Sequence, residues 1–241
     1  MQLYFIRHGQ SENNLLWAQS GSSERRSADP GLTAVGRQQA HGVAQFLRRA
    51  DSPAAANSDE DSQNRAGFGI THLYTSLMVR AVATGTIIAQ ALGLPLVAWE
   101  DLHEWGGIYR TDEETGERIG LPGHNRAYFE THYPELVLPD LLGDEGWWNR
   151  PFETREERPA RARRFLHDLL DRHGGADDRV AVVSHGGFHR ELLWAVLGVP
   201  EGNGCWLALN NGALTRVDFN GEETALSYLN RAGFLPRELI T

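Results

Sequence analysis

Short apolar runs are spaced along the chain and end in polar or glycine-containing motifs. The run QLYFI at 2–6 is followed directly by Arg7-His8-Gly9, and the run RVAVV at 179–183 is followed by Ser184-His185-Gly186. Continuous apolar runs of this length are typical of buried strands in parallel sheets. Both runs therefore predict parallel strands in the interior of one sheet.

Stretches of helical periodicity lie between and after these runs, at 32–49, 76–92, 154–173 and 188–197. Strands that alternate with helices predict an α/β fold with helices on both faces of the sheet. We therefore expect a three-layer α/β/α sandwich with a mostly parallel central sheet.

The pattern changes near the C-terminus, where two Asn-Gly pairs, at 211–212 and 220–221, separate the runs CWLALN, ALTRVDF and TALSYL. Asn-Gly between apolar runs is a strong hairpin signal. The sheet is therefore expected to become antiparallel toward the C-terminus, as a meander.

Two segments interrupt the alternation within what is predicted to be a single domain over residues 1–241. Residues 51–67 are small, polar and include a proline, which favours a mobile surface loop. Residues 105–152 are rich in Gly, Pro and aromatic side chains and predict a lid-like insertion. Its Trp147 and Trp148 could line a pocket, but packing of the insertion onto the domain is the favoured use.

The charge composition excludes several kinds of site. All 23 basic residues are arginines, and the net charge is −9. A Walker A loop, a protein-kinase ATP site, a Schiff-base enzyme and a pyridoxal phosphate enzyme each need a lysine. The acidic balance also argues against nucleic acid and anionic membranes as partners, although a small basic pocket remains compatible with it.

Cellular location is also suggested by the sequence. The chain has one cysteine, Cys205, so it cannot form an internal disulfide. No apolar run approaches the roughly 18 residues of a membrane span, and the first residues do not have the pattern of a signal peptide. We therefore expect a cytoplasmic protein with no membrane association.

Candidate chemistry gathers where the predicted strands end. Arg7, His8 and His185 follow two strands, and Arg80 lies in the first turn of a predicted helix that Ser76 could cap. The carboxyl ends of parallel strands form the ligand crevice of an open α/β sheet. Arginine forks, imidazoles and free helix N–H groups together predict a binding site for a phosphoryl group.

The segment LYFIRHGQSENN, in which Asn14 follows His8 by six residues, resembles the Arg-His-Gly signature of the histidine phosphatase superfamily, also called phosphoglycerate mutase-like. The similarity continues through four further blocks in the family's order: GLTAVGRQQA (31–40), LYTSLMVRAVATG (73–85), LHEWGG (102–107) and VVSHGG (182–187). It implies a phosphoglycerate mutase-like fold, a small phosphorylated substrate and, as is common in such families, a possible homodimer.

The resemblance also implies a role for each matching residue. His8 is the nucleophile that becomes phosphorylated, and Glu104 is the general acid and base. The phosphoryl oxygens would be held by Arg7, Arg80 and His185, with Asn14 and Gly186 as further phosphate contacts. A protonated His185 would suit this role best. Neither a metal nor a cofactor is required, because fixed cations and N–H groups can stabilise a phosphoryl transition state.

Several functions remain open. Family members include phosphatases and mutases, and mutases generally carry a lysine and paired arginines after the glutamate. Here residues 105–148 contain only three arginines (110, 118 and 126), with four acidic residues beside them (112, 113, 114 and 117). We therefore predict a metal-independent phosphomonoesterase for a small metabolite, with phosphoglycerate mutase as the alternative and a non-catalytic phosphate-binding protein as the second alternative.

Two competing interpretations are disfavoured. His185 and His189 have the spacing of metal ligands on one helix face, but Gly186 follows the first histidine and no third ligand is apparent. The acid-phosphatase branch of the family has an aspartate where this chain has Gly186. We therefore assign no metal ligands, and the proton donor is expected to be Glu104.

Overall fold

The computed structural model describes residues 1–49, 61–200, 206–221 and 223–241. Its strands are β1 (Gln2–Arg7), β2 (His72–Thr75), β3 (Leu96–Ala98), β4 (Tyr109–Thr111), β5 (Arg118–Gly120), β6 (Leu136–Val137), β7 (Arg179–Ser184), β8 (Leu214–Asn220) and β9 (Glu223–Arg231). Its α-helices are α1 (Glu12–Ser20), α2 (Ala34–Leu47), α3 (Val79–Leu92), α4 (Arg126–His132), α5 (Arg158–His173) and α6 (Gly186–Leu197), and two short 3₁₀ helices are η2 (Glu100–Leu102) and η3 (Arg237–Leu239).

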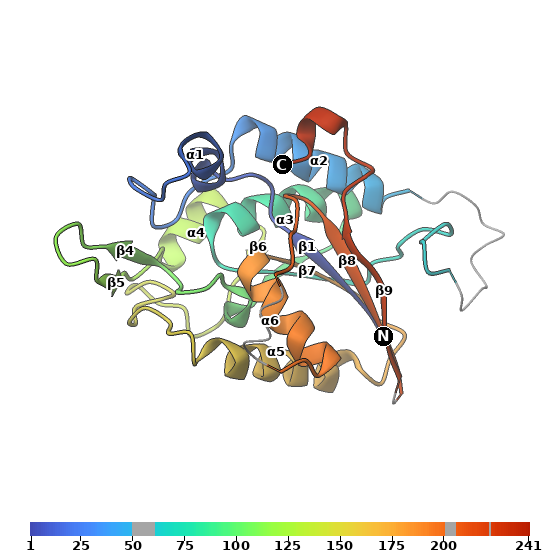
Figure 1. Cartoon of the computed structure of the whole chain (residues 1–241). Coiled ribbons are helices and arrows are strands. Elements are labelled where there is room, and N and C mark those ends of the chain that lie inside the picture. The colour runs from blue at the N-terminus through green and yellow to red at the C-terminus, as the bar shows by residue number, and fades with distance from the viewer. Residues whose placement is uncertain (50–60, 201–205, 222) are drawn as a thin grey trace.

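One seven-stranded sheet forms the centre of the molecule, in the order β6-β3-β2-β7-β1-β8-β9 (Figure 1). β1 pairs in parallel with β7, and β2 pairs in parallel with β7 and β3. β8 pairs antiparallel with both β1 and β9. The predicted sheet, mostly parallel and antiparallel toward the C-terminus, is therefore confirmed.

Helices cover both faces of this sheet: α2 and α3 lie on one side, and α5 and α6 on the other (Figure 1). Alternate residues of β1 enter the two cores. Tyr4 and Ile6 belong to the core beside α2 and α3, whereas Leu3 and Phe5 belong to the core beside α5 and α6. Strand side chains point alternately to opposite faces, so a fully apolar strand serves two cores at once. The three-layer sandwich is thus confirmed.

The run CWLALN was predicted to be a strand, and this prediction is wrong for its described residues, since 206–210 are irregular. No position beside β8 is open to this run, because β8 already pairs with β1 on one side and β9 on the other. The backbone of this run serves another purpose, since an Arg7 guanidinium nitrogen donates to the carbonyl oxygen of Leu209.

The loop expected over 51–67 lies partly outside the described residues, which resume at Asp61. Asn64 is buried, donates to the Tyr4 hydroxyl at 2.7 Å and accepts from the Tyr228 hydroxyl at 2.9 Å. Asp61 accepts from the backbone N–H groups of Arg65 and Ala66. The described end of this segment is therefore anchored to β1 and β9 through Asn64.

The segment 105–152 contains more regular structure than its irregular pattern suggested. It forms the β4–β5 hairpin and α4, and β6 joins the main sheet beside β3. Among the described helices, none combines the length and apolarity needed to cross a bilayer.

Candidate active site

His8 lies immediately after β1, at the carboxyl ends of the parallel strands, and its side chain is 3% exposed. The chain turns here against the start of α2, where a Cβ on Gly9 would lie 2.3 Å from the Gly36 carbonyl oxygen. Nδ1 of His8 donates to the Gly9 carbonyl oxygen at 2.7 Å, because a carbonyl can only accept. This contact leaves Nε2 without a proton, so that its lone pair can accept a hydrogen bond or attack an electrophile.

Two arginines lie beside His8. Arg80 Nε donates to His8 Nε2 at 3.2 Å, and Arg7 precedes His8 in the chain. Burial, with the charges of Arg80 and then Arg7, holds the pKa of His8 well below its usual value of 6.5. The imidazole is therefore neutral at physiological pH, which is the state in which its nitrogen is a nucleophile.

Arg80 is itself held by a buried carboxylate that the sequence analysis did not single out. Asp29 forms an ion pair with Arg80 at 3.7 Å and accepts from the Val79 N–H at 3.1 Å, at the start of α3. Burial raises the pKa of Asp29 to about 6, against the opposing effect of Arg80. Asp29 thus fixes both the guanidinium and the helix from which it projects.

Arg7 and His185 each retain a polar atom without a protein partner. Arg7 Nε and His185 Nδ1 are buried and have no hydrogen-bond partner among the described residues. The His185 ring lies 5.0 Å from that of His8, measured between centroids. Buried polar atoms are usually hydrogen-bonded, so these two are available to a ligand.

The environment of His185 differs from the expected one. Its pKa is held well below 6.5, first by burial and then by the charge of Arg80, so the ring is neutral rather than protonated. Ser76 does not cap α3, whose N-cap is Met78. The Ser76 hydroxyl instead bonds His185 Nε2 at 2.9 Å and accepts from the Met78 N–H at 3.2 Å.

Glu104 lies at the start of α6, where its carboxylate accepts three backbone hydrogen bonds. Its oxygens accept from the N–H groups of Trp105 at 2.9 Å, Gly187 at 3.1 Å and Phe188 at 3.1 Å. A Cβ on Gly187 would lie 2.3 Å from Glu104 Oε1, so glycine is what allows this approach. Glu104 is therefore tied to the same helix end that follows His185.

The expectation that free helix N–H groups bind the phosphoryl group is wrong for most donors at these helix ends. Val79 N–H at the start of α3 donates to Asp29, and Gly187 and Phe188 at the start of α6 donate to Glu104. Side-chain carboxylates compete for helix N-termini because both the dipole and the unpaired N–H groups favour them. Gly186 lines the cavity beside Arg7.

Asn14 lies in α1 and also lines the cavity. Its Oδ1 accepts from the Ser11 N–H at 3.1 Å, the Ser11 hydroxyl at 3.0 Å and the Asn211 amide at 3.2 Å. With its oxygen occupied in this way, Asn14 can contact an anion only through its NH₂ group.

A cavity of about 670 Å³ opens above His8. Six of the seven predicted site residues line it, namely Arg7, His8, Asn14, Arg80, Glu104 and Gly186, while the buried His185 lies next to His8 without lining the cavity. The structure thus brings together residues from β1, α1, α3, η2–β4 and the β7–α6 junction.

Two further cations line the cavity and were missed by the sequence analysis, Arg26 and Arg190. The Arg26 guanidinium lies 4.2 Å from the centroid of Tyr109, and that of Arg190 lies 4.1 Å from Trp105 and 4.8 Å from Trp206. Arg190 follows Gly186 by four residues and so shares its helix face, which is a signal the sequence contained. Arg26 follows no periodic pattern and had no such signal.

The tryptophan pair and the acidic residues of the insertion lie elsewhere. Trp147 and Trp148 are 5% and 4% exposed and pack against His103 in the core, so the favoured packing role is confirmed. Asp112, Glu113 and Glu114 belong to the turn between β4 and β5 and do not line the cavity. These acidic residues therefore do not determine which substrate the cavity accepts.

The histidine pair considered for a metal is also separated by the fold. His189 is buried against the Phe5 ring, at 4.2 Å between centroids, and neither of its nitrogens has a hydrogen-bond partner among the described residues. Burial lowers its pKa to about 3. His189 is a core side chain, whereas His185 faces His8.

Comparison with known proteins agrees with this arrangement. The family model of the histidine phosphatase superfamily (branch 1) matches residues 3–61 and 62–232. The chain belongs to this superfamily. The resemblance inferred from the Arg-His-Gly and Ser-His-Gly-Gly motifs is thereby confirmed, and with it the prediction of a histidine phosphatase.

Three similar proteins illustrate the range of the family. A probable phosphoglycerate mutase, GpmB, of Yersinia enterocolitica is 31% identical over 227 residues, covering 91% of this chain and 85% of its own. A protein of Hydrogenobacter thermophilus, provisionally assigned as a phosphoserine phosphatase, is 26% identical and covers 95% of both chains. The structure of Entamoeba histolytica phosphoserine phosphatase in complex with 3-phosphoglyceric acid has a TM-score of 0.61 at 21% identity, over 98% of this chain and 99% of that one.

Proposed function

We propose that this chain is a metal-independent phosphomonoesterase that hydrolyses a small phosphorylated metabolite through a phosphohistidine on His8. The observation that carries the proposal is the state of His8. Its Nδ1 proton is held by the Gly9 carbonyl, its pKa is depressed, and its unprotonated Nε2 accepts from Arg80 Nε beside the cavity that both residues line. A neutral, oriented imidazole next to fixed cations is suited to attack phosphorus.

In the first step the phosphoryl oxygens bind Arg7 and Arg80, with the NH₂ group of Asn14 as a further donor. The Ser76 hydroxyl accepts from Met78, so its own hydrogen can bond His185 Nε2. That arrangement leaves the proton of His185 on Nδ1, free for a phosphoryl oxygen. His8 Nε2 attacks phosphorus as the ester P–O bond breaks, and the leaving oxygen takes a proton from Glu104.

In the second step water attacks the phosphorus of the phosphohistidine. Glu104 accepts a proton from that water, the P–N bond breaks, and its electron pair returns to His8 Nε2. Inorganic phosphate leaves, and Glu104 is again protonated for the next cycle. The three backbone N–H groups that hold the Glu104 carboxylate support this role because they keep it at the mouth of the phosphoryl site.

The size and lining of the cavity indicate the kind of substrate. A volume of about 670 Å³ suits a metabolite rather than a macromolecule. Arg26 and Arg190 add two cations beyond Arg7 and Arg80, which favours a leaving group that carries a second acidic group. The same two arginines favour phosphoglycerate mutase as the second candidate, since they could grip a carboxylate.

The proposal is tested by phosphate release from p-nitrophenyl phosphate, with EDTA present throughout. We compare the wild type with His8→Ala, and with His41→Ala as the control for loss of an exposed histidine from α2. A mutase assay on 3-phosphoglycerate is run in parallel. The expected result is phosphate release that depends on His8 and exceeds mutase turnover.

Other results would overturn the proposal. Equal rates for wild type and His8→Ala would reject His8 as the nucleophile. Mutase turnover that exceeds hydrolysis would establish the second candidate. Inactivity in both assays, with inorganic phosphate still bound in calorimetry, would favour the non-catalytic binding protein.

A further inference from the structure

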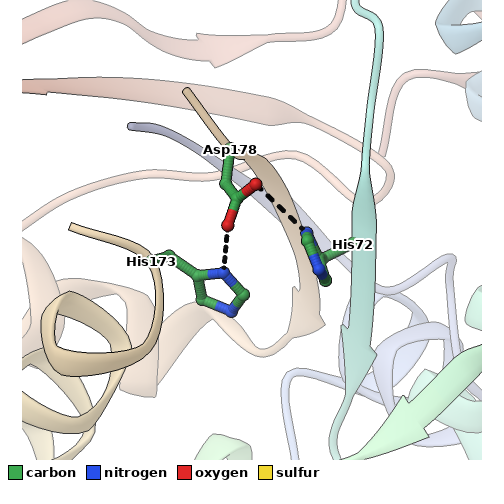
Figure 2. A group of neighbouring side chains, drawn as sticks. All are labelled: His72, His173 and Asp178. Carbon is green, nitrogen blue, oxygen red and sulfur yellow. Dashed lines mark hydrogen bonds and ion pairs between the residues drawn. The ribbon is translucent and has the colours of Figure 1, made fainter. Parts of the chain in front are cut away.

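A second group of histidines lies at the opposite end of the sheet from His8. His72 begins β2, His173 ends α5, and Asp178 directly precedes β7. Figure 2 shows both imidazole rings turned toward the Asp178 carboxylate, which lies between them. The six residues of β7 span roughly 20 Å, so this group is well separated from the candidate active site.

The ligand atoms of this group converge closely. His173 Nδ1 lies 2.7 Å from Asp178 Oδ2, and His72 Nδ1 lies 3.9 Å from Asp178 Oδ1 (Figure 2). One atom from each residue lies within 4.8 Å of the other two. Bonds of about 2.0–2.2 Å to a tetrahedral zinc ion place neighbouring ligand atoms roughly 3.3 Å apart, so ligand atoms that lie as much as 4.8 Å apart would have to approach by up to about 1.5 Å to complete the site.

The surroundings of His173 fit a metal ligand. Its Nε2 lies 3.0 Å from the Tyr74 hydroxyl, which is buried with it. A metal on Nδ1 needs the proton on Nε2, and Tyr74 can accept that hydrogen bond. Ligating histidines typically have a partner of this kind on the second ring nitrogen, which fixes tautomer and ring orientation.

The exposure of these side chains and the chemistry of their ligand atoms indicate which metal ion the group would bind. The side chain of His72 is 42% exposed and that of Asp178 is 24% exposed, so an ion can enter and keep a water molecule as its fourth ligand. Two imidazoles and one carboxylate suit zinc and its neighbours in the transition series, whereas Mg²⁺ and Ca²⁺ prefer oxygen ligands alone.

We propose that His72, His173 and Asp178 form a structural Zn²⁺ site that ties the end of α5 to the starts of β2 and β7. The site is independent of catalysis at the other end of the sheet. It departs from the sequence analysis, which assigned no metal ligands. His173 is in fact buried, at 5% exposure.

The test measures metal content and stability on protein first stripped with chelator. Wild type, His72→Ala, Asp178→Asn and the control His41→Ala are dialysed against Zn²⁺ and analysed for bound metal. Co²⁺ serves as a spectroscopic probe, because a tetrahedral site gives it strong visible absorption. Thermal unfolding is recorded with Zn²⁺, with Mg²⁺ and without metal, and phosphate release is assayed in the same samples.

The expected result is about one Zn²⁺ per chain for wild type and His41→Ala, with tetrahedral Co²⁺ absorption. Zn²⁺ should raise Tm, Mg²⁺ should not, and phosphate release should not change on metal removal. His72→Ala and Asp178→Asn should weaken Zn²⁺ binding on the order of tenfold or more. Wild-type protein that binds no Zn²⁺, or variants that bind it as tightly as wild type, would overturn the proposal.

Discussion

The central sheet carries a pair of histidines at each end, and the two pairs have opposite electrostatic surroundings. At the carboxyl ends of the strands, His8 and His185 lie beside Arg7 and Arg80. At the amino ends, His72 and His173 share the carboxylate of Asp178. The same side chain is therefore placed to meet an anion at one end and a cation at the other.

The difference shows that neighbouring charge decides what a histidine can do. Burial, with the charges of Arg80 and Arg7, keeps the His8 ring neutral, and the arginines supply donors beside it, which suits attack on a phosphoryl group. A carboxylate between two imidazoles supplies negative charge and lone pairs, which suits a divalent metal. The strands supply the positions, and the side chains of the connecting segments supply the charges.

The largest expected effect is the difference in kcat between a variant at the His8 end of the sheet and a variant at the His72 end. His8→Ala should reduce kcat for p-nitrophenyl phosphate by roughly a thousandfold or more, because it removes the proposed carrier of the phosphoryl intermediate. His72→Ala should leave kcat close to that of wild type. Steady-state rates of both purified variants measure this contrast, and a comparable loss in His72→Ala would show that the two ends are coupled.

The cations at the catalytic end can be tested through Arg80. Arg80→Met should lower kcat/KM by about a hundredfold, as expected for a preorganised charge that contacts the phosphoryl oxygens. The matched control is Arg164→Met, since Arg164 forms an ion pair with Asp101 on the protein surface. Equal kcat/KM values for these two variants would remove Arg80 from the phosphoryl site.

His189 shows chiefly the effect of burial, which lowers its pKa more than the charge of Arg7 does, and its ring nitrogens have no hydrogen-bond partner among the described residues. Its folded-state pKa of about 3 lies below the unfolded value of 6.5, so the unfolded state binds more protons below pH 6.5 and stability falls as pH decreases. At pH 5, the lowered pKa of His189 reduces the free energy of unfolding by about 2 kcal/mol. His189→Leu should therefore lose less stability than wild type between pH 7 and pH 5 in urea unfolding, and parallel losses would contradict this.

The smallest expected effect concerns Asp29, which positions Arg80. Its pKa of about 6 means that the carboxylate is ionised, and able to pair with Arg80, above that pH. The kcat/KM of the wild type should increase as the pH rises through 6. In Asp29→Asn, kcat/KM should not show this increase, and at pH 7.5 it should be about tenfold lower than in the wild type. Asp168→Asn, a change at a partly exposed position of α5, should retain the wild-type profile. An unchanged profile in Asp29→Asn would show that Asp29 is only structural.

Local sequence determined much of the architecture. The apolar runs before His8 and His185 form adjacent parallel strands, because a run that is apolar on both faces is stable only between two helix layers. Adjacent parallel strands end at the same edge, so the sequence alone predicted that Arg7, His8 and His185 converge. The predicted helices also form, with α3 beginning at Val79 rather than at Ser76.

Only the tertiary structure decided which partner each polar group takes. Ser76 bonds His185, Asp29 pairs with Arg80, and Glu104 occupies the N–H groups of α6. Each of these groups had a plausible local partner, and the final choice depends on which distant segment packs closest. Arg26 enters the cavity, and Asp178 lies between His72 and His173, for the same reason. Periodicity reports which face of an element is buried, whereas contacts between segments far apart in the chain are set by the packing of those faces.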